Sequence, residues 1–358
     1  MKLKNTLLLS ALAGVMAAPT AMAEDSHQVY GQVNISMDST SVSGDGLSQA
    51  QKDGSAAVVG RNAGMGFKSN ASRFGLKGKM DTNLADFKLQ YHAEMEYVVV
   101  GDADASNVYG REATVGLNSK TKGFLRMGRL TTLYKANYAA MDPWTDHVLQ
   151  ARASGQQGAS NLNANYFNNA IEYRSPRMSG FQVGAFYSVM HDGSTQQMHN
   201  AGKLAGYIGG SASGAGINYV QSGLKLALDT ITLDADTVGG GASNGTALKF
   251  TAEYKLNSDL TLGGHYEDTS DLYLGTNIFA VASYQVGNAL FTLSGGLNQV
   301  DSDSTKNAYN DEDATTLNVG TKYKLNKNAS LIAGYSTFTR DNVTANTVTV
   351  GIDSKFGY

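Results

Sequence analysis

Apolar and polar residues alternate with period two through most of this chain, and this alternation constrains the fold more than any other feature of the sequence. In residues 29–37, VYGQVNISM, the apolar Val29, Val33 and Ile35 alternate with polar side chains. In residues 247–256, ALKFTAEYKL, Leu248 and Phe250 do the same. Successive side chains of a β-strand point to opposite faces, so each segment predicts a strand with one apolar and one polar face. No segment shows a sustained helical apolar stripe.

Counted by this alternation, the chain contains about sixteen strands of roughly ten residues. An even number of strands allows an antiparallel sheet to close on itself. The predicted strands are residues 28–38, 71–80, 84–98, 109–118, 122–130, 169–175, 180–190, 214–222, 224–234, 245–257, 260–270, 276–287, 288–300, 314–326, 330–340 and 347–358.

Short and long connections alternate between these strands. Short turns, most of them with Asn, Gly, Asp or Ser, are expected at residues 82–83, 120–121, 176–179, 258–259, 287–288 and 327–329. Between them lie long stretches rich in Ser, Gly and Asn: residues 39–70, 99–108, 131–168, 191–213, 235–244, 301–313 and 341–346. The sequence therefore predicts an up-and-down sheet with the turns at one end and the loops at the other.

The N-terminal segment has the pattern of a secretory signal peptide. Lys2 and Lys4 precede a short apolar stretch, and residues 21–23, AMA, match a cleavage position. The stretch is shorter than the roughly 20 residues of a membrane-spanning helix. We therefore expect a signal peptide at residues 1–23 and one domain at 24–358. Without Lys2 and Lys4, 26 of the 28 Lys and Arg residues remain, and 31 Asp and Glu residues outnumber them. This negative net charge argues against a nucleic-acid partner.

A soluble sandwich and a membrane barrel both satisfy the alternation. Strands of about ten residues match the length that a tilted strand needs to cross a bilayer. Short turns that alternate with long loops are typical of outer-membrane barrels. In hydrocarbon every backbone polar group needs an internal partner, so a sheet there must close. We predict an all-β, 16-stranded antiparallel up-and-down transmembrane β-barrel.

A repeated hairpin supports the barrel. Residues 253–266, EYKLNSDLTLGGHY, and 322–335, KYKLNKNASLIAGY, nearly repeat each other, and in both copies a tyrosine precedes a tight turn. Tyrosine prefers the membrane–water boundary, although it also has a high β-propensity. The apolar face of the last strand carries Phe356 and the terminal Tyr358. We predict an aromatic girdle near the turns that includes Tyr173, Tyr254, Tyr284 and Tyr323.

Five ordered landmarks resemble the general diffusion porins of Gram-negative outer membranes, especially the neisserial and betaproteobacterial type. They are SRFGLKG (72–78), REATVGL (111–117), GR (128–129), MDPW (141–144) and NNAIEYRSP (168–176). The second half of the chain is similar only in strand rhythm and in the terminal aromatic residue.

The resemblance implies a homotrimer of barrels, each a water-filled pore through which small hydrophilic solutes and ions diffuse without a cofactor. The third loop, residues 131–168 here, is expected to fold inward and to set acidic residues against basic ones on the wall. Arg73 and Arg111 match the family's wall arginines, Arg129 its Gly-Arg landmark, and Asp142 the acidic part of the loop. The predicted pore constriction consists of Arg73, Lys77, Glu94, Arg111, Arg129, Asp142 and Asp146.

Strand parity adds to these assignments. Arg73, Lys77 and Glu94 fall on the polar face, towards the lumen, whereas Arg111 aligns with Ala113 on the apolar face. A charge that faces lipid at mid-membrane costs roughly 2–4 kcal/mol, so only the resemblance and a position near the rim point Arg111 inward. Residues 163–169, NANYFNN, lack a basic residue that many relatives have there. We expect weak ion selectivity that leans towards cations.

Other functions stay open at this stage. A substrate-specific channel would use Tyr134, Tyr138 and Trp144 as an aromatic track, although packing of the loop against the wall also explains Trp144. An outer-membrane hydrolase would need a nucleophile, a base and an orienting group, and the six histidines form no such constellation in the sequence. Residues 301–313 partly match calcium-loop spacing, but Lys306 replaces the required glycine. We interpret them as an acidic outer loop whose bound cations bridge lipopolysaccharide.

Overall fold

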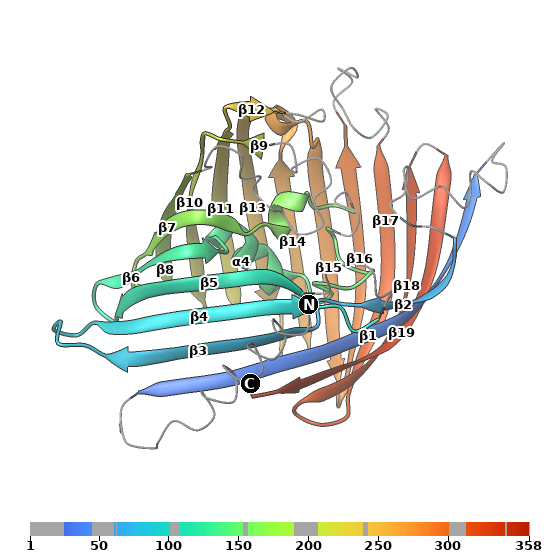
Figure 1. Cartoon of the computed structure of the whole chain (residues 1–358). Coiled ribbons are helices and arrows are strands. Elements are labelled where there is room, and N and C mark those ends of the chain that lie inside the picture. The colour runs from blue at the N-terminus through green and yellow to red at the C-terminus, as the bar shows by residue number, and fades with distance from the viewer. Residues whose placement is uncertain are drawn as a thin grey trace, which may run out of the picture.

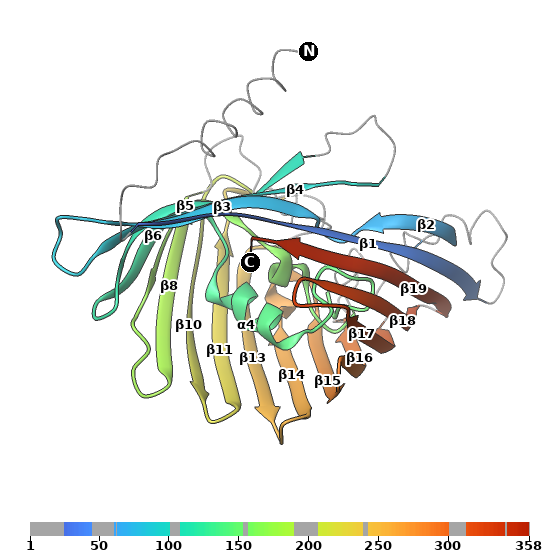
Figure 2. The same ribbon diagram turned by 90° about the horizontal axis from the view of Figure 1, so that it is seen from below.

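The computed structural model describes residues 25–44, 61, 63–100, 108–152, 157–189, 207–238, 243–300, 313–340 and 342–357. The predicted signal peptide, most of the acidic loop 301–313 and Tyr358 lie outside these residues. Within them, antiparallel strands form one large sheet that closes on itself around a lumen (Figures 1 and 2).

The barrel has sixteen strands in the described residues, as the sequence predicts. Two segments, β2 and β3, both pair with β1, at its residues 35–40 and 26–32, so together they make one barrel strand that is interrupted at residues 70–72. The strands are β1 (Ser26–Gly44), β2 (Gly64–Ser69), β3 (Arg73–Asp81), β4 (Lys88–Tyr97), β5 (Val108–Ser119), β6 (Gly123–Leu130), β7 (Phe167–Arg174), β8 (Phe181–Val189), β10 (Ser211–Gln221), β11 (Leu224–Asp234), β13 (Gly245–Lys255), β14 (Leu260–Asp268), β15 (Thr276–Val286), β16 (Ala289–Gln299), β17 (Ala314–Lys324), β18 (Ala329–Arg340) and β19 (Val343–Phe356).

Closure joins the two ends of the chain. β1 pairs antiparallel with β19 over fourteen positions, from Gly31 opposite Phe356 to Gly44 opposite Val343. These strands are longer than predicted because residues 39–44 and 343–346, which the sequence pattern assigned to loops, pair with each other. Backbone pairing needs no apolar alternation, so the sequence pattern did not reveal it. A separate two-stranded pair joins two of the predicted loops: β9 (Tyr207–Ile208) lies in loop 191–213 and β12 (Thr237–Val238) lies in loop 235–244.

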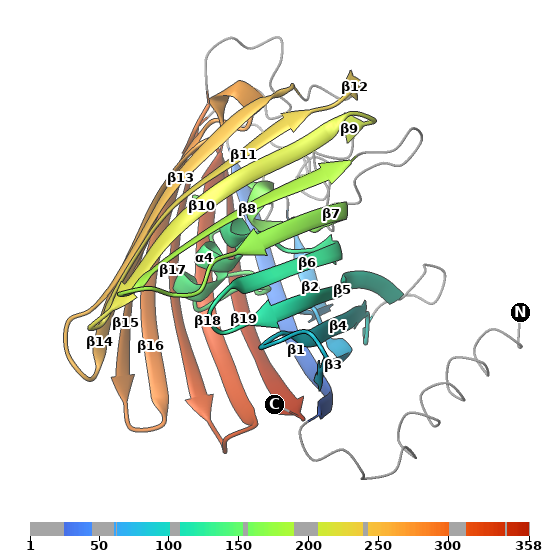
Figure 3. The ribbon, with the colours of Figure 1, turned by 90° about the vertical axis from the view of Figure 1, so that its left-hand side faces the viewer.

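The predicted turns lie at one end of the barrel (Figures 1 and 3). The largest boundary difference at this end is that β4 begins at Lys88 rather than at residue 84. Residues 82–87 form a turn in which the Thr82 hydroxyl donates to the Phe87 carbonyl at 2.6 Å and the Phe87 amide to the Leu84 carbonyl at 2.9 Å. These local bonds satisfy groups that a longer strand would have paired.

The two faces of the strands have opposite chemistry. On β13, Leu248 and Phe250 are 47% and 46% exposed, whereas Lys249 between them is 0% exposed and points inward. Large apolar side chains cover the outer surface in the same way on the other strands. The half-exposed outer surface carries the predicted tyrosine girdle near the turns: Tyr173, Tyr254, Tyr284 and Tyr323. An apolar band with an aromatic border is the surface that a lipid bilayer requires.

The third loop folds into the lumen, where Figure 2 shows it inside the ring of strands. It contains α4 (Leu133–Met141) and η2 (Asn161–Ala164), and α4 contacts β10, β11, β13 and β14. The sequence pattern predicts no helix here. Nine residues are too few for a stable isolated helix, and α4 depends on burying Leu133, Tyr138 and Met141 against its surroundings. Another short helix, η4 (Ser270–Leu272), follows β14. Among the described helices, none is long and apolar enough to cross a membrane.

Glycines on the inner wall make room for the loop. A Cβ atom at Gly320 would lie 2.2 Å from the Trp144 ring, and one at Gly334 would lie 2.4 Å from Leu149 Cδ1. Glycine weakens a strand and often marks a close approach of other atoms, so these glycines leave space for side chains of the loop. We call such positions glycine seats. Further seats pair Gly184 with Leu133 and Gly263 with Met141.

Candidate pore constriction

Two cavities in the lumen meet at the inward loop. A turn-side cavity of about 630 Å³ reaches Lys225 and Lys355, close to the short turns. A loop-side cavity of about 590 Å³ reaches Val98 and Tyr109, near the opposite end. Four charged side chains line both cavities, which marks them as the border between the two spaces. We call them the constriction quartet: Arg111, Lys135, Asp146 and Arg152.

A β-bulge turns Arg111 into the lumen. The register between β4 and β5 passes from Glu94 opposite Glu112 to Met95 opposite Gly110, so Arg111 is an extra residue. A bulge bends the strand and redirects its side chains. As a result Arg111 and Glu112 are both buried, although they are neighbours in sequence. The unfavourable parity of Arg111 in the sequence thus has a structural explanation.

Two carboxylates hold the Arg111 guanidinium. Its Nε donates to Glu94 Oε1 at 2.6 Å, and its Nη1 donates to Glu96 Oε2 at 2.5 Å. Glu94 also accepts a bond of 2.7 Å from the Tyr30 hydroxyl. Such charge-assisted bonds are short and directional. They fix the guanidinium on the wall and partly neutralise its charge.

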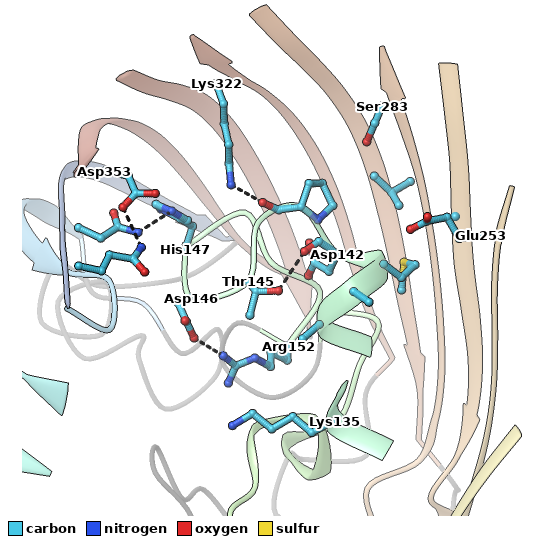
Figure 4. Close-up of a pocket in the computed structure, with 18 of the residues that line it drawn as sticks. Lys135, Asp142, Thr145, Asp146, His147, Arg152, Glu253, Ser283, Lys322 and Asp353 are labelled. Carbon is cyan, nitrogen blue, oxygen red and sulfur yellow. Dashed lines mark hydrogen bonds and ion pairs between the residues drawn. The ribbon is translucent and has the colours of Figure 1, made fainter. Parts of the chain in front are cut away.

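Asp146 presents a carboxylate from the loop to these wall arginines. Its Oδ1 accepts a hydrogen bond from Arg152 (Figure 4). Its Oδ2 lies 3.8 Å from Arg73 Nη2. Asp146 has a φ of 75°, a left-handed conformation that aspartate tolerates better than most residues. Burial favours the neutral acid, but Arg152, Arg111 and Arg73 together lower the pKa of Asp146 below its usual range. The carboxylate is therefore ionised at neutral pH.

Asp142, the other predicted loop acid, faces the loop's own backbone. It accepts hydrogen bonds from the Tyr138 hydroxyl at 2.5 Å and from the amides of Trp144 and Ala151, both at 2.9 Å. Burial raises the pKa of its carboxyl group. Although Asp142 borders the turn-side cavity, its oxygens are occupied in shaping the loop.

Arg73 projects from the wall into the turn-side cavity. Its Nε and Nη2 donate to Gln32 Oε1 at 3.0 Å and 2.6 Å, which holds the guanidinium in place. Lys77 lies nearer the turns, with its Nζ 4.7 Å from the centre of the Tyr30 ring. It is not among the described residues that line the two cavities.

Arg129 stays near the wall as well. Its Nε donates to the carbonyls of Gly110 and Arg111 at 3.0 Å and 2.9 Å, and its Nη1 donates to Asn168 at 2.6 Å. The described lining of the two cavities does not include it. Arg73, Arg111 and Asp146 thus lie together on the turn-side cavity, with Glu94 paired to Arg111. Glu94, Lys77 and Arg129 are not among the described residues that line the two cavities.

Two residues of the constriction quartet, Lys135 and Arg152, were missed by sequence reasoning. Lys135 Nζ donates to the Ala164 carbonyl at 2.9 Å and lies 3.5 Å from the centre of the Tyr166 ring. The signal was present, because Lys135 and Arg152 are the basic residues of loop 131–168. The predicted constriction included only the acidic residues of that loop, Asp142 and Asp146. A loop that narrows a pore places charges of both signs at the passage, so its basic residues are candidates as well as its acids.

Buried charges on the wall anchor the loop. Glu267 accepts hydrogen bonds from the Tyr134 hydroxyl at 2.5 Å, the Asn163 side chain at 2.7 Å and the Ser160 amide at 2.7 Å. Lys249 Nζ donates to Asn163 Oδ1 at 2.7 Å. Burying a charge is costly unless it is paired and hydrogen-bonded, so these residues strongly favour one position of the loop.

The aromatic residues of the loop also serve as anchors. Tyr134, Tyr138 and Trp144 are 2%, 0% and 1% exposed, and Trp144 Nε1 donates to the Thr292 hydroxyl at 2.6 Å. Beside them, His147 Nε2 lies 3.1 Å from Asn34 Nδ2, and burial lowers the pKa of His147 to about 3. Side chains this buried offer little surface to a passing solute. The packing interpretation of Trp144 therefore agrees with its position.

A family model described as Gram-negative porin matches residues 9–343. The chain belongs to the Gram-negative porin family. This porin is accordingly a passive diffusion channel of the outer membrane and not an enzyme. The sequence-based prediction of family, function and location is confirmed.

Known proteins of similar sequence and structure agree with this assignment. An outer membrane porin protein of Bordetella pertussis is 26% identical over 394 residues, a match that covers 99% of this chain and 100% of that protein. An anion-selective porin from Comamonas acidovorans has a TM-score of 0.67 at 20% identity, covering 93% of this chain and 100% of that one. The trimer form of in-vitro folded OmpT from Vibrio cholerae has a TM-score of 0.61 at 16% identity, covering 93% and 99%.

Proposed function

We propose that the constriction quartet, together with Arg73, sets the ion selectivity of this porin and gives it a preference for anions. The observation that supports the proposal is the charge of the described lining. Seven Lys or Arg residues and four Asp or Glu residues line the turn-side cavity, and four and two line the loop-side cavity. Fixed charge of one sign along a narrow water-filled passage biases which ions enter. The lean towards cations that we expected from the sequence did not take Lys135 and Arg152 into account.

The arrangement also supports a transverse electric field at the constriction. Arg73 and Arg111 lie on the wall, and Asp146 with Arg152 lies on the loop. In this interpretation Glu94 compensates Arg111. Opposed charges across a narrow passage orient dipolar solutes as they pass. We assign Asp142 to the fold of the loop and Lys77 and Arg129 to the wall outside the constriction.

The finer features of the assembly are proposals as well. We infer that residues 1–23 are removed on export and that residues 24–358 form the mature barrel. A homotrimer is supported by the trimer form of the structurally similar OmpT. It is also supported by β2, which in the described residues pairs with β1 alone and leaves one strand edge for a neighbouring subunit. The outer apolar band would contact lipid, including lipopolysaccharide.

A salt-gradient reversal potential measured in planar bilayers tests the selectivity. Arg73→Gln removes a wall cation and should shift the potential towards cation preference. Asp146→Asn removes the loop anion and should shift it the opposite way. Lys324→Gln, an exposed substitution near the turns, is the matched control and should leave the potential unchanged. A cation-selective native protein, or two variants that do not shift in opposite directions, would contradict the proposal.

A further inference from the structure

A third cavity, which we call the α4 cleft, lies between α4 and the inner wall and has a volume of about 280 Å³. One face of α4 lines it with a repeat at helical spacing, in which Asn137 is the single polar side chain: Leu133, Ala136, Asn137, Ala140 and Met141. A nine-residue helix is about 13 Å long, so the cleft is elongated. Ala140, Met141, Lys225 and Glu253 line both the cleft and the turn-side cavity. Solutes in the pore can therefore reach it from the side.

The wall opposite α4 combines an apolar floor with basic side chains. Val220 and Ala227 form the floor, and Arg174 and Arg177 lie at its edge. Residues of this kind suit a ligand with both an apolar and a charged part.

Arg177 is the basic group best placed to receive an anion. Its Nη1 donates to the Gly180 carbonyl at 2.6 Å, and its Nη2 donates to Asn218 Oδ1 at 2.8 Å. Both acceptors are neutral, and no described carboxylate pairs with this guanidinium. By contrast, Lys225 is already paired with Glu253 at 2.5 Å. Arg177 is also exposed, so an anion in the cleft can approach it.

Two buried polar atoms on the cleft residues have no hydrogen-bond partner in the described structure. They are the hydroxyl oxygen of Thr251, a residue only 5% exposed, and Nε of Arg174. Buried polar atoms in proteins nearly always have a partner. Other buried atoms without a partner lie elsewhere in the described residues, but these two belong to residues that line one small cavity, where a bound molecule would supply the missing acceptor or donor.

We propose that the α4 cleft binds small anions with an apolar body, such as aryl or short alkyl carboxylates. The apolar body lies along α4 and the carboxylate is held at Arg177. The inference rests on the pore function, because the solute arrives through the turn-side cavity. It adds a solute preference to a passage that otherwise sorts ions by charge and size. Each additional buried methylene group should strengthen binding about fourfold.

Single-channel recording with carboxylates of increasing apolar size tests the cleft. Hexanoate or benzoate, added on the turn side in potassium chloride, should reduce the conductance saturably, whereas acetate at the same concentration should not. Arg177→Gln should raise the half-blocking concentration of benzoate roughly tenfold, because it removes a charged hydrogen bond. Ala136→Leu should abolish the block by filling the cleft. Lys324→Gln, which removes an exposed charge outside the cleft lining, should leave the half-blocking concentration unchanged.

The outcomes separate this inference from the pore function. Normal conductance in potassium chloride combined with a linear response to benzoate would overturn the cleft and leave the pore intact. Equal half-blocking concentrations in the native protein, Arg177→Gln and Ala136→Leu would also overturn it. Absence of stepwise conductance in potassium chloride alone would instead contradict the channel itself. Arg177→Gln changes an exposed side chain, so the test does not depend on Ala136→Leu folding correctly.

Discussion

Individual residues in this porin reach the lumen through local departures from regular strand geometry. The bulge at Arg111 reverses the face that sequence parity assigned to it, and Asp146 uses a left-handed backbone conformation. Neither feature follows from the alternation of apolar and polar residues, which counts positions in an unbroken strand. Arg73, by contrast, lies in a regular strand segment and lines the turn-side cavity, on the face that parity alone predicts.

Arg111→Met should destabilise the folded barrel by about 3 kcal/mol, because it leaves the carboxylates of Glu94 and Glu96 buried without their shared cation. Urea unfolding in detergent micelles measures the change. Adding Glu94→Gln and Glu96→Gln to the same chain should recover part of the loss, since the uncompensated charge is then removed. Lys324→Met, at an exposed site, should change stability by less than about 0.5 kcal/mol. An Arg111→Met protein as stable as the native one would contradict this account.

At the scale of elements, the sequence predicted the strands well and the inward loop poorly. Each strand separates lipid from a wet interior, so its alternation repeats along the whole chain and sixteen barrel strands could be counted. The loop contacts wall residues that are distant in sequence, such as Glu267 with Ser160 and Lys249 with Asn163. Those contacts depend on closure of the barrel. The landmark MDPW gave the position of the loop, but α4 and the role of Asp142 required the structure.

Gly320→Ala should displace the inward loop. Its new Cβ atom would lie 2.2 Å from the Trp144 ring, closer than real Cβ contacts, and strand backbone leaves little freedom to adjust. We expect a changed single-channel conductance and a lower midpoint temperature of thermal unfolding. Gly295→Ala is the matched control, because the nearest atom to its Cβ would be the Thr316 carbonyl oxygen at 3.5 Å. Equal conductance in both variants would show that Trp144 does not position the loop at Gly320.

At the scale of the whole molecule, closure between β1 and β19 makes one barrel of the described strands. An even strand count, short turns at one end and an apolar outer band were all visible in the sequence, because each repeats many times. In our proposal the number of subunits depends instead on one surface, where β2 pairs on a single side in the described residues. A sequence pattern averaged over many strands does not report such a local feature.

The folded protein should have the mass of three chains in a mild detergent, as measured by native mass spectrometry. The reason is that a neighbouring subunit can cover the free edge of β2, which would otherwise expose backbone polar groups. Phe67→Glu, on the exposed outer face of β2, should shift the population towards monomers. Phe291→Glu, an equally apolar outward position on β16, is the control and should leave the subunit count unchanged. Monomers in the native preparation would contradict the homotrimer.

The glycine seats of the inner wall have a consequence for how such a protein can diversify. Trp144 and Leu149 pack against Gly320 and Gly334, which have no side chain beyond a hydrogen atom. One added methyl group at either glycine is therefore enough to displace the loop. Single substitutions on distant strands can therefore change the width of the pore without replacing any charged residue in the passage. Protein engineers who want nanopores of graded size can vary these wall glycines, and because the loop carries Lys135, Asp146 and Arg152, ion preference will change together with pore size.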